Sequence, residues 1–419
     1  MTTSTGGTDA IREALPTARE RPASDYPIDG TLPGRAFRPE TSDEVAVLLA
    51  AANKAWQTVT PQGGRTALRL GRPLAAYDVA LDMTGLDRVV AYEPEDLTVT
   101  VEAGMTLARL QALLGERGQY LPVDPPPDDR VTIGGLLATA RPGAWRSHVP
   151  AARDLVLGAT VVTADGSLVK SGGRVVKNVS GYDLHRMHTG ALGAFGVLVG
   201  ASFKVAPLPS GRLTFALRCA HLEQAAEIAF ALWGQSLPLR ALSLLAPAAA
   251  EAAGLPAAPH VLLECVGAAA VIARTREAVH RQAVLLRANG GEALGGDEPW
   301  TRLRALAGDD AGTVLRLGVP ASALAAAIEE AADEGCAAWG HLAAGSVIAR
   351  APGLDVAAVE RLRAHAEEAG GFLQIESADA SMRRAVDPFG AGERALVRAL
   401  KREFDPQDTI NRGRWMEDV

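Results

Sequence analysis

Residues 61–66 read PQGGRT and combine a chain reversal with groups that attract an anion. Pro61 ends a strand-forming run, and two glycines permit positive φ, so that successive backbone N–H groups can converge on one anion. An arginine and a threonine add a cation and a hydroxyl at the same place. A plain tight turn can have the same composition. The residues expected to contact a pyrophosphate are Pro61, Gln62, Gly63, Gly64, Arg65 and Thr66.

A second loop, within residues 122–140, leads into a short apolar helix that opens on two glycines. The glycines let the backbone come close to a planar ring or a phosphate, and a helix start favours negative charge. Small residues at this point can also serve packing alone. The coincidence with the first loop favours a cofactor site. Its expected members here are Pro125, Thr132, Ile133, Gly134 and Gly135.

A third glycine-rich stretch, GALGAFGVLV, spaces Gly190, Gly193 and Gly196 evenly by three. A Rossmann turn needs glycines at the first, third and sixth positions, before a helix. Here β-branched residues follow and two prolines close the run, which predicts a strand. We therefore expect a strand that passes close to a cofactor and not a dinucleotide-binding turn.

The thiols offer no cluster or zinc site, because Cys219, Cys265 and Cys336 are isolated and form no CxxC pair. An iron–sulfur cluster that served this chain would therefore lie in another chain. A net charge of -7 gives no basic field for nucleic acid. Proline and charged residues interrupt the apolar runs before they reach the length of a membrane span. These features predict a cytoplasmic protein that reaches a membrane only through partners.

The pattern of elements predicts an α+β protein with four parts. Short strands dominate the first half, and recurrent β-α-β pieces in the second half suit a ferredoxin-like cap. The expected parts are a flexible arm at 1–34, a cofactor domain at 35–206, the cap at 207–400 and a tail at 401–419 that packs back on the cofactor domain.

Taken in order, these motifs resemble those of the FAD-linked oxidases with a vanillyl-alcohol-oxidase-like (PCMH-type) FAD-binding domain. The resemblance implies two α+β subdomains that clasp an extended FAD, with the pyrophosphate on residues 61–66 and the flavin along 132–135. It also implies that the adenine and ribose lie against Gly193, Gly196 and Val197, and that Lys177 and Asn178 contact the cofactor. The matching segments are PQGGRT, LDMTGLDRVV, VTVEAGMTLARLQALL, PVDP, TIGGLLATA, RDLVLGATVVTADGSLVKSGG, VKNVSGYDLHRMHTGALGAFGVLV and FDPQDTINRGR.

Departures from the family pattern refine the expectation. Some relatives attach the flavin to a histidine in or near the first loop, whereas Arg65 stands here, which indicates non-covalent FAD. The family's HxGDGNxH metal motif is reduced to GHLAAGSVI, in which His341 and Gly345 remain. Val149 and Pro150 replace a Tyr-Gly pair before Arg153 and Asp154, for which a structural ion pair is an alternative to a flavin contact. We expect no metal and a cap without catalytic residues. A structural role is the expected one for His341, His185 and His188.

Three functions remain open. The first, most similar to the FAD-binding subunits of bacterial glycolate oxidases, is a subunit of a 2-hydroxy-acid dehydrogenase. Its implied partners are a catalytic FAD subunit and an iron–sulfur subunit. The second is a self-sufficient FAD oxidoreductase of a small hydroxy acid or alcohol. The third is a non-redox assembly subunit that has lost FAD. The intact glycines at 63, 64, 134 and 135 count against the third.

Overall fold

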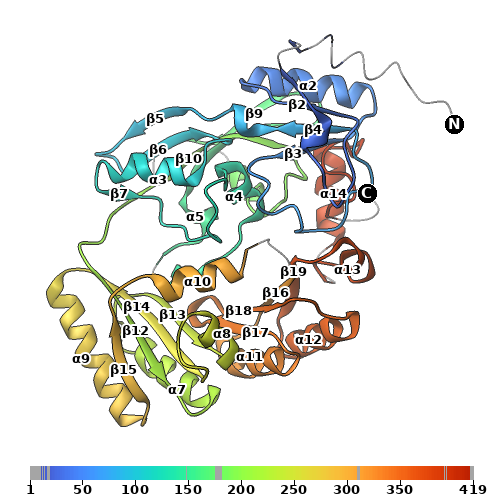
Figure 1. The fold of residues 1–419 in the computed structure, drawn as a ribbon. Helices are drawn as coiled ribbons and strands as arrows, with labels where there is room; N and C mark the ends of the chain where they lie inside the picture. The colour runs from blue at the N-terminus through green and yellow to red at the C-terminus, as the bar shows by residue number, and fades with distance from the viewer. Residues whose placement is uncertain are drawn as a thin grey trace.

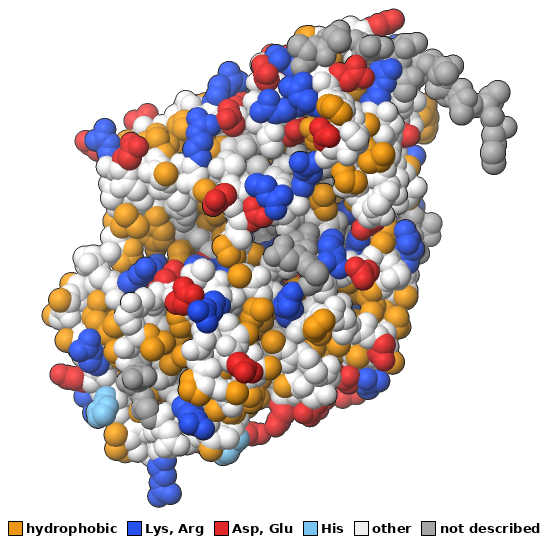
Figure 2. Space-filling model, in the orientation of Figure 1, with side chains coloured by type: hydrophobic (Ala, Val, Ile, Leu, Met, Phe, Trp, Pro, Cys, Tyr) orange, Lys and Arg blue, Asp and Glu red, His pale blue; other side chains and the backbone are white. Residues whose placement is uncertain are grey.

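The computed structural model describes residues 11, 13, 15, 16, 19–147, 149–174, 182–308, 312–390, 392 and 394–415. Two bodies lie one above the other in Figure 1: an N-terminal body with two larger sheets and a two-stranded one, β11-β7, and a C-terminal body with one broad sheet. Charged side chains of both signs are interspersed over the face in Figure 2. Among the described residues, no helix is both long enough and apolar enough to cross a bilayer.

The first sheet of the N-terminal body pairs strands in the order β1-β2-β4-β3, with β4 parallel to β2 and β3. Helix α2 begins where the Thr41 hydroxyl accepts a hydrogen bond from the Glu44 N–H. Its apolar residues recur with the helical period and are buried against this sheet. The elements are β1 Glu20–Arg21, η2 Ala23–Asp25, β2 Arg35–Phe37, α2 Ser42–Lys54, β3 Val59–Gln62, β4 Val79–Asp82 and η3 Met83–Gly85.

The second sheet of the N-terminal body is antiparallel, in the order β5-β6-β10-β8-β9. Its core contains alternate residues of β6 and β10 together with leucines of α3 and α4. The elements are β5 Val89–Glu93, β6 Thr98–Glu102, α3 Leu107–Gly115, β7 Gln119–Tyr120, α4 Ile133–Thr139, η4 Ala144–Ser147, α5 Ala152–Leu155, β8 Val156–Val162, β9 Leu168–Gly172, α6 Leu184–Met187, β10 Val197–Lys204 and β11 Ala206–Pro207.

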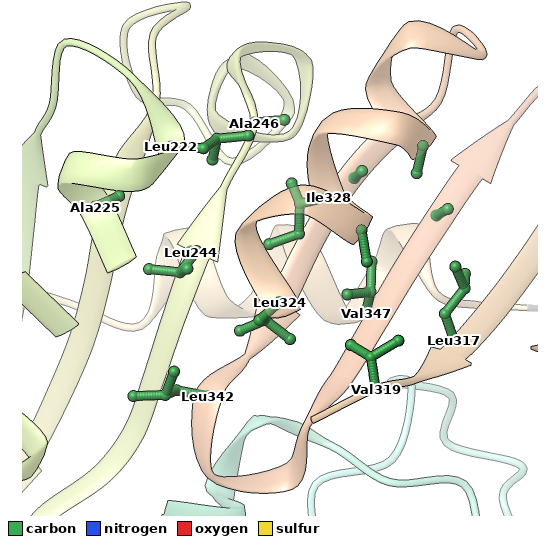
Figure 3. Packing of buried hydrophobic residues seen from close by; sticks show 14 of the residues in the cluster. Leu222, Ala225, Leu244, Ala246, Leu317, Val319, Leu324, Ile328, Leu342 and Val347 are labelled. Atoms are coloured by element: carbon green, nitrogen blue, oxygen red, sulfur yellow. The ribbon is translucent and has the colours of Figure 1, made fainter. Parts of the chain in front are cut away.

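The cap contains the expected ferredoxin-like unit twice. In the first unit the strand order β15-β12-β14-β13 follows a βαββαβ chain with the short helix α8 added between β13 and β14, and the second unit repeats the order as β17-β18-β16-β19. The units join where β13 pairs with β17 over three residue pairs, which makes one eight-stranded sheet. Figure 3 shows side chains of both units in one core, including Leu244, Leu324 and Ile328.

The bounds of the C-terminal elements are β12 Arg212–Arg218, α7 Leu222–Trp233, β13 Leu239–Leu245, α8 Pro247–Ala252, β14 His260–Val266, α9 Ala269–Leu285, β15 Asn289–Leu294, α10 Glu298–Leu306, β16 Thr313–Gly318, η5 Ala321–Ala323, α11 Leu324–Asp333, β17 Ala337–His341, η6 Leu342–Ala344, β18 Ser346–Ala351, α12 Val356–Glu368, β19 Phe372–Ser377, α13 Ala380–Ala385 and α14 Arg394–Phe404.

Two expected boundaries need correction. Residues 19–34 are not a loose arm, because β1 pairs with β2 and both Tyr26 and Ile28 are buried in an apolar cluster. Helix α14, expected to belong to the cap, instead packs on Phe195 of the N-terminal body. The tail does return to that body: the Val59 N–H donates to the Thr409 carbonyl over 2.7 Å.

Candidate cofactor-binding site

Segments far apart in the sequence enclose one cavity of about 330 Å³ in the N-terminal body. The walls come from the first glycine loop, the proline loop, helix α4 and the tail, and part of α10 closes it from the cap. A smaller cavity of about 80 Å³ lies against Gly193–Leu198. The two cavities form a continuous groove, because both are lined by Pro61, Gln62, Gly63, Thr132, Gly135, Ala138, Leu192 and Asn411.

The two adjacent glycines of the first loop let it touch the second loop. A Cβ on Gly63 would lie 2.0 Å from the Thr132 Oγ1 atom, and one on Gly64 would lie 1.6 Å from the Arg130 carbonyl oxygen. The expectation that these glycines supply positive φ is wrong, since the left-handed residue of the loop is Arg65, at φ 60°. The glycines are needed for close approach of two backbones.

Polar groups in this loop are left without protein partners. Among the described residues, the backbone N–H groups of residues 63–66 donate no hydrogen bond. The buried Thr60 Oγ1 and Gln62 Oε1 atoms likewise have none. Unpaired buried polar atoms cost free energy unless something binds them. The N–H groups and the Thr60 hydroxyl can donate, so they fit an acceptor-rich group such as a pyrophosphate, and FAD carries one. The Gln62 Oε1 atom is an acceptor and needs a donor instead.

Arg65 lines the cavity, but its guanidinium is already held by protein groups. It donates to the Asp25 carbonyl and stacks 5.1 Å from the centre of the Tyr26 ring. Arg130 and Arg414 also line the cavity, and the sequence interpretation named neither of them. Arg130 pairs with Asp128, and Arg414 donates to the Leu68 carbonyl.

The third glycine stretch holds the backbone against the smaller cavity. Gly193 and Gly196 have φ of 70° and 145°, and Val197 begins strand β10. The Asn411 side chain donates to the Leu192 carbonyl over 2.7 Å, which ties the tail to this stretch. Asn411 was missed, although the quoted tail motif DTINRGR contains it and offered the signal.

Most of the other expected site residues also line the groove. Pro125, Thr66 and Thr132 line the larger cavity, and Gly134 lines the smaller one. Ile133 lines neither, because its side chain is fully buried in the core of the second sheet. Lys177 and Asn178 lie outside the described residues.

The two candidate histidines of the N-terminal body line none of these cavities. His185 lies beside the Ser171 hydroxyl, and both histidines are buried. Burial lowers the pKa of His188 to about 4, so the ring is neutral near pH 7. Arg153 and Asp154 form an exposed ion pair with a separation of 3.9 Å, which agrees with the structural alternative.

A second pocket, bounded by the N-terminal body and the cap, joins the groove at Pro126 and Arg141. In it the Glu376 carboxylate accepts hydrogen bonds from the Arg141 and Arg316 Nε atoms over 2.6 and 2.7 Å. Burial alone would raise the pKa of Glu376, but the two guanidiniums outweigh it and hold that pKa below its usual range.

His341 also lines this pocket, with its Nδ1 atom 2.7 Å from the Ser243 hydroxyl. Burial lowers the pKa of His341 to about 4. The partly buried Asp124 carboxylate accepts from the Trp145 N–H, yet burial raises its pKa to about 7. Within the described part of the chain, no three His, Cys, Asp or Glu residues are grouped to hold a metal ion.

Comparison with known proteins agrees with this geometry, since residues 33–172 match the family model of an FAD binding domain. Residues 33–172 are thus similar to FAD binding domains. Solved structures share its fold: p-cresol methylhydroxylase has a TM-score of 0.76 at 16% identity, with 97% of this chain and 96% of that chain covered. An alkyldihydroxyacetonephosphate synthase has a TM-score of 0.73 at 17% identity, with 100% and 86% covered.

Curated relatives match mainly through the FAD-binding part. Glycolate oxidase subunit GlcE of Escherichia coli (strain K12) is 36% identical over 45% of this chain and 54% of its own length. The mitochondrial D-lactate dehydrogenase [cytochrome] of Arabidopsis thaliana is 28% identical over 67% of this chain and 50% of its length. The chain thus spans about half the length of these curated relatives, which are oxidoreductases of hydroxy acids by name.

Proposed function

We propose that this chain is the FAD-binding subunit of a multi-subunit 2-hydroxy-acid dehydrogenase of the glycolate type. The observation that carries the proposal is the continuous groove, with unpaired N–H groups on its first loop and glycines where that loop meets the second one. The match to a glycolate oxidase subunit supports the assignment to a complex. Its partners would be a catalytic FAD subunit and an iron–sulfur subunit.

The FAD would be held without a covalent bond. Among the described residues that line the two cavities of the groove, none is a histidine, cysteine or tyrosine, the side chains that could attach to a flavin. In this proposal residues 63–66 hold the pyrophosphate, residues 132–135 lie along the flavin, and residues 193–197 face the adenosine. Bound FAD supplies electron transfer, and the chain supplies its binding, orientation and exclusion of water.

The incomplete metal motif supports a role of this chain in electron transfer. It counts against oxidation of the substrate by this chain alone. Three of its positions are held by Ala344, Ser346 and Ile348, none of which can replace an imidazole or carboxylate ligand. The self-sufficient oxidoreductase remains the competing function, because the pocket that adjoins the groove is bordered by the Arg141–Glu376–Arg316 cluster.

The test is a visible absorption spectrum of the purified chain before and after acid precipitation. Flavin bands that move to the supernatant support non-covalent FAD, whereas flavin in the pellet overturns it. A protein that stays colourless after FAD is added favours the assembly subunit. Bleaching of the bound flavin by glycolate, in the chain alone, would favour the self-sufficient enzyme over the subunit.

A further inference from the structure

The pocket between the N-terminal body and the cap is bordered by a buried cluster of two arginines and one glutamate. Arg141 follows α4 in the N-terminal body, Arg316 lies on β16 of the cap, and both side chains are largely buried. Arg316 does not line the pocket itself, but its guanidinium meets that of Arg141 at Glu376, which does. Two guanidiniums that converge on one buried point suit a carboxylate ligand. Because the pocket adjoins the groove, a molecule bound there would lie next to the cofactor.

That carboxylate position is already filled by the protein itself. Glu376, on β19, is 2% exposed and gives one carboxylate oxygen to each arginine. A second nitrogen of each arginine is also used: Arg141 Nη2 donates to the Ala307 carbonyl over 2.5 Å, and Arg316 Nη2 donates to the Gln374 side chain. The space left over is about 30 Å³, which holds about one or two water molecules.

We propose that Glu376 is an intramolecular ligand that occupies the carboxylate site beside the cofactor and excludes small 2-hydroxy carboxylates from it. Removal of this side chain should turn the pocket into a site for a short monocarboxylate. The inference rests on the proposed function only in that the neighbouring groove holds FAD. Glu376 is then the residue that keeps small carboxylates out of this pocket.

The test uses acetate as the probe, because Glu376→Ala removes a CH2–COO⁻ group and acetate is CH3–COO⁻. The full chain and the E376A variant are titrated with sodium acetate at constant ionic strength, and the melting temperature is followed. We expect E376A to be destabilised and then restored by acetate in a saturable manner, with no saturable response in the unchanged chain. A double variant, E376A with R141M, should lose at least tenfold in acetate affinity.

Glu334→Ala is the matched control, since it removes a carboxylate from an exposed pair with Arg361 and should show no acetate response. If E376A does not fold, the unchanged chain still decides the question. Saturable binding of glycolate or acetate to the unchanged chain, weakened by Arg141→Met, would overturn the proposal. An E376A variant whose melting temperature does not respond to acetate would overturn it as well. The acetate test reads the melting temperature and does not depend on bound flavin. Failure of the proposed function would instead be seen in the absorption spectrum, as a protein without flavin.

Discussion

At the scale of single residues, the site depends on contacts that only glycine allows. The Gly63–Thr132 and Gly64–Arg130 approaches bring the first and second loops together, and the unpaired N–H groups lie on the same loop. A side chain at either glycine would push the two loops apart and move those N–H groups.

Gly64→Ala is therefore expected to lower FAD affinity by about tenfold or more, equal to about 1.4 kcal/mol, and to cost about 1–3 kcal/mol in stability. The flavin-to-protein absorbance ratio and the melting temperature measure the two effects. Gly353→Ala is the control, because a Cβ there meets nothing within 4 Å. An unchanged flavin content in the Gly64 variant would show that the loop contact does not shape the site.

His341 provides a prediction on pH. Its pKa is near 4 in the folded protein because of burial and about 6.5 in the unfolded chain, so the unfolded state binds more protons between these values. Its contribution to stability is present above pH 6.5 and is lost as the pH falls toward 4, by at most about 3 kcal/mol. His341→Asn should lose less stability over this range in denaturant titrations. An identical acid loss in both proteins would contradict the assignment.

At the scale of elements, the tail is held by a buried ion pair. Lys401 of α14 binds Asp405 over 2.6 Å and also donates to the carbonyls of Ala194 and Ile410. Asp405 accepts in addition from the N–H groups of Thr409 and Ile410. This network fixes the segment that carries Asn411 and Arg414 into the groove.

Lys401→Met should destabilise the protein by about 3–5 kcal/mol, because it leaves the buried Asp405 carboxylate without its counter-charge. We also expect faster proteolysis within residues 405–415 and weaker FAD binding. The neighbouring Arg402, which is exposed on the same helix, provides the control as Arg402→Met. Equal proteolysis rates in the two variants would argue against the network as the anchor of the tail.

The helices and strands themselves were largely predictable, whereas the contacts between distant segments were less so. The β-branched residues after Gly196 predicted strand β10, and the recurrent β-α-β pieces predicted the ferredoxin-like cap. The conformation of Gly64 was not predictable, because its need for glycine arises from Arg130, a residue distant in sequence. The burial of Tyr26 was missed for the same reason. The sequence around it is polar and contains proline, and the hydroxyl of Tyr26 donates to Asp82, which is distant in sequence. Long-range contacts of this kind leave no local pattern.

At the scale of the whole molecule, several buried clusters connect the N-terminal body to the cap. One is the Arg141–Glu376–Arg316 cluster, and another places Arg240 of the cap 4.0 Å over the Trp145 ring, with Glu264 paired to Arg240. In a third, Arg383 of α13 donates to the Gly71 carbonyl and pairs with Asp29. Each body has its own apolar core. The two bodies could therefore unfold separately if these connections were weakened.

Trp145→Ala is expected to cost about 2 kcal/mol and to split the calorimetric unfolding transition into two, one for each body. Trp56→Ala, which alters a side chain that is 68% exposed, is the matched control and should leave the trace unchanged. A single transition in both variants would mean that other contacts suffice to couple the bodies.

The groove takes its walls from Gly63 and Gly64 near one end of the described chain and from Asn411 and Arg414 near the other. This distribution has a consequence for biosynthesis. A nascent chain cannot present a finished flavin site until residue 414 has left the ribosome, however early the first sheets fold. FAD loading should therefore be a late event, and ribosome-bound chains halted within the cap should not retain the cofactor.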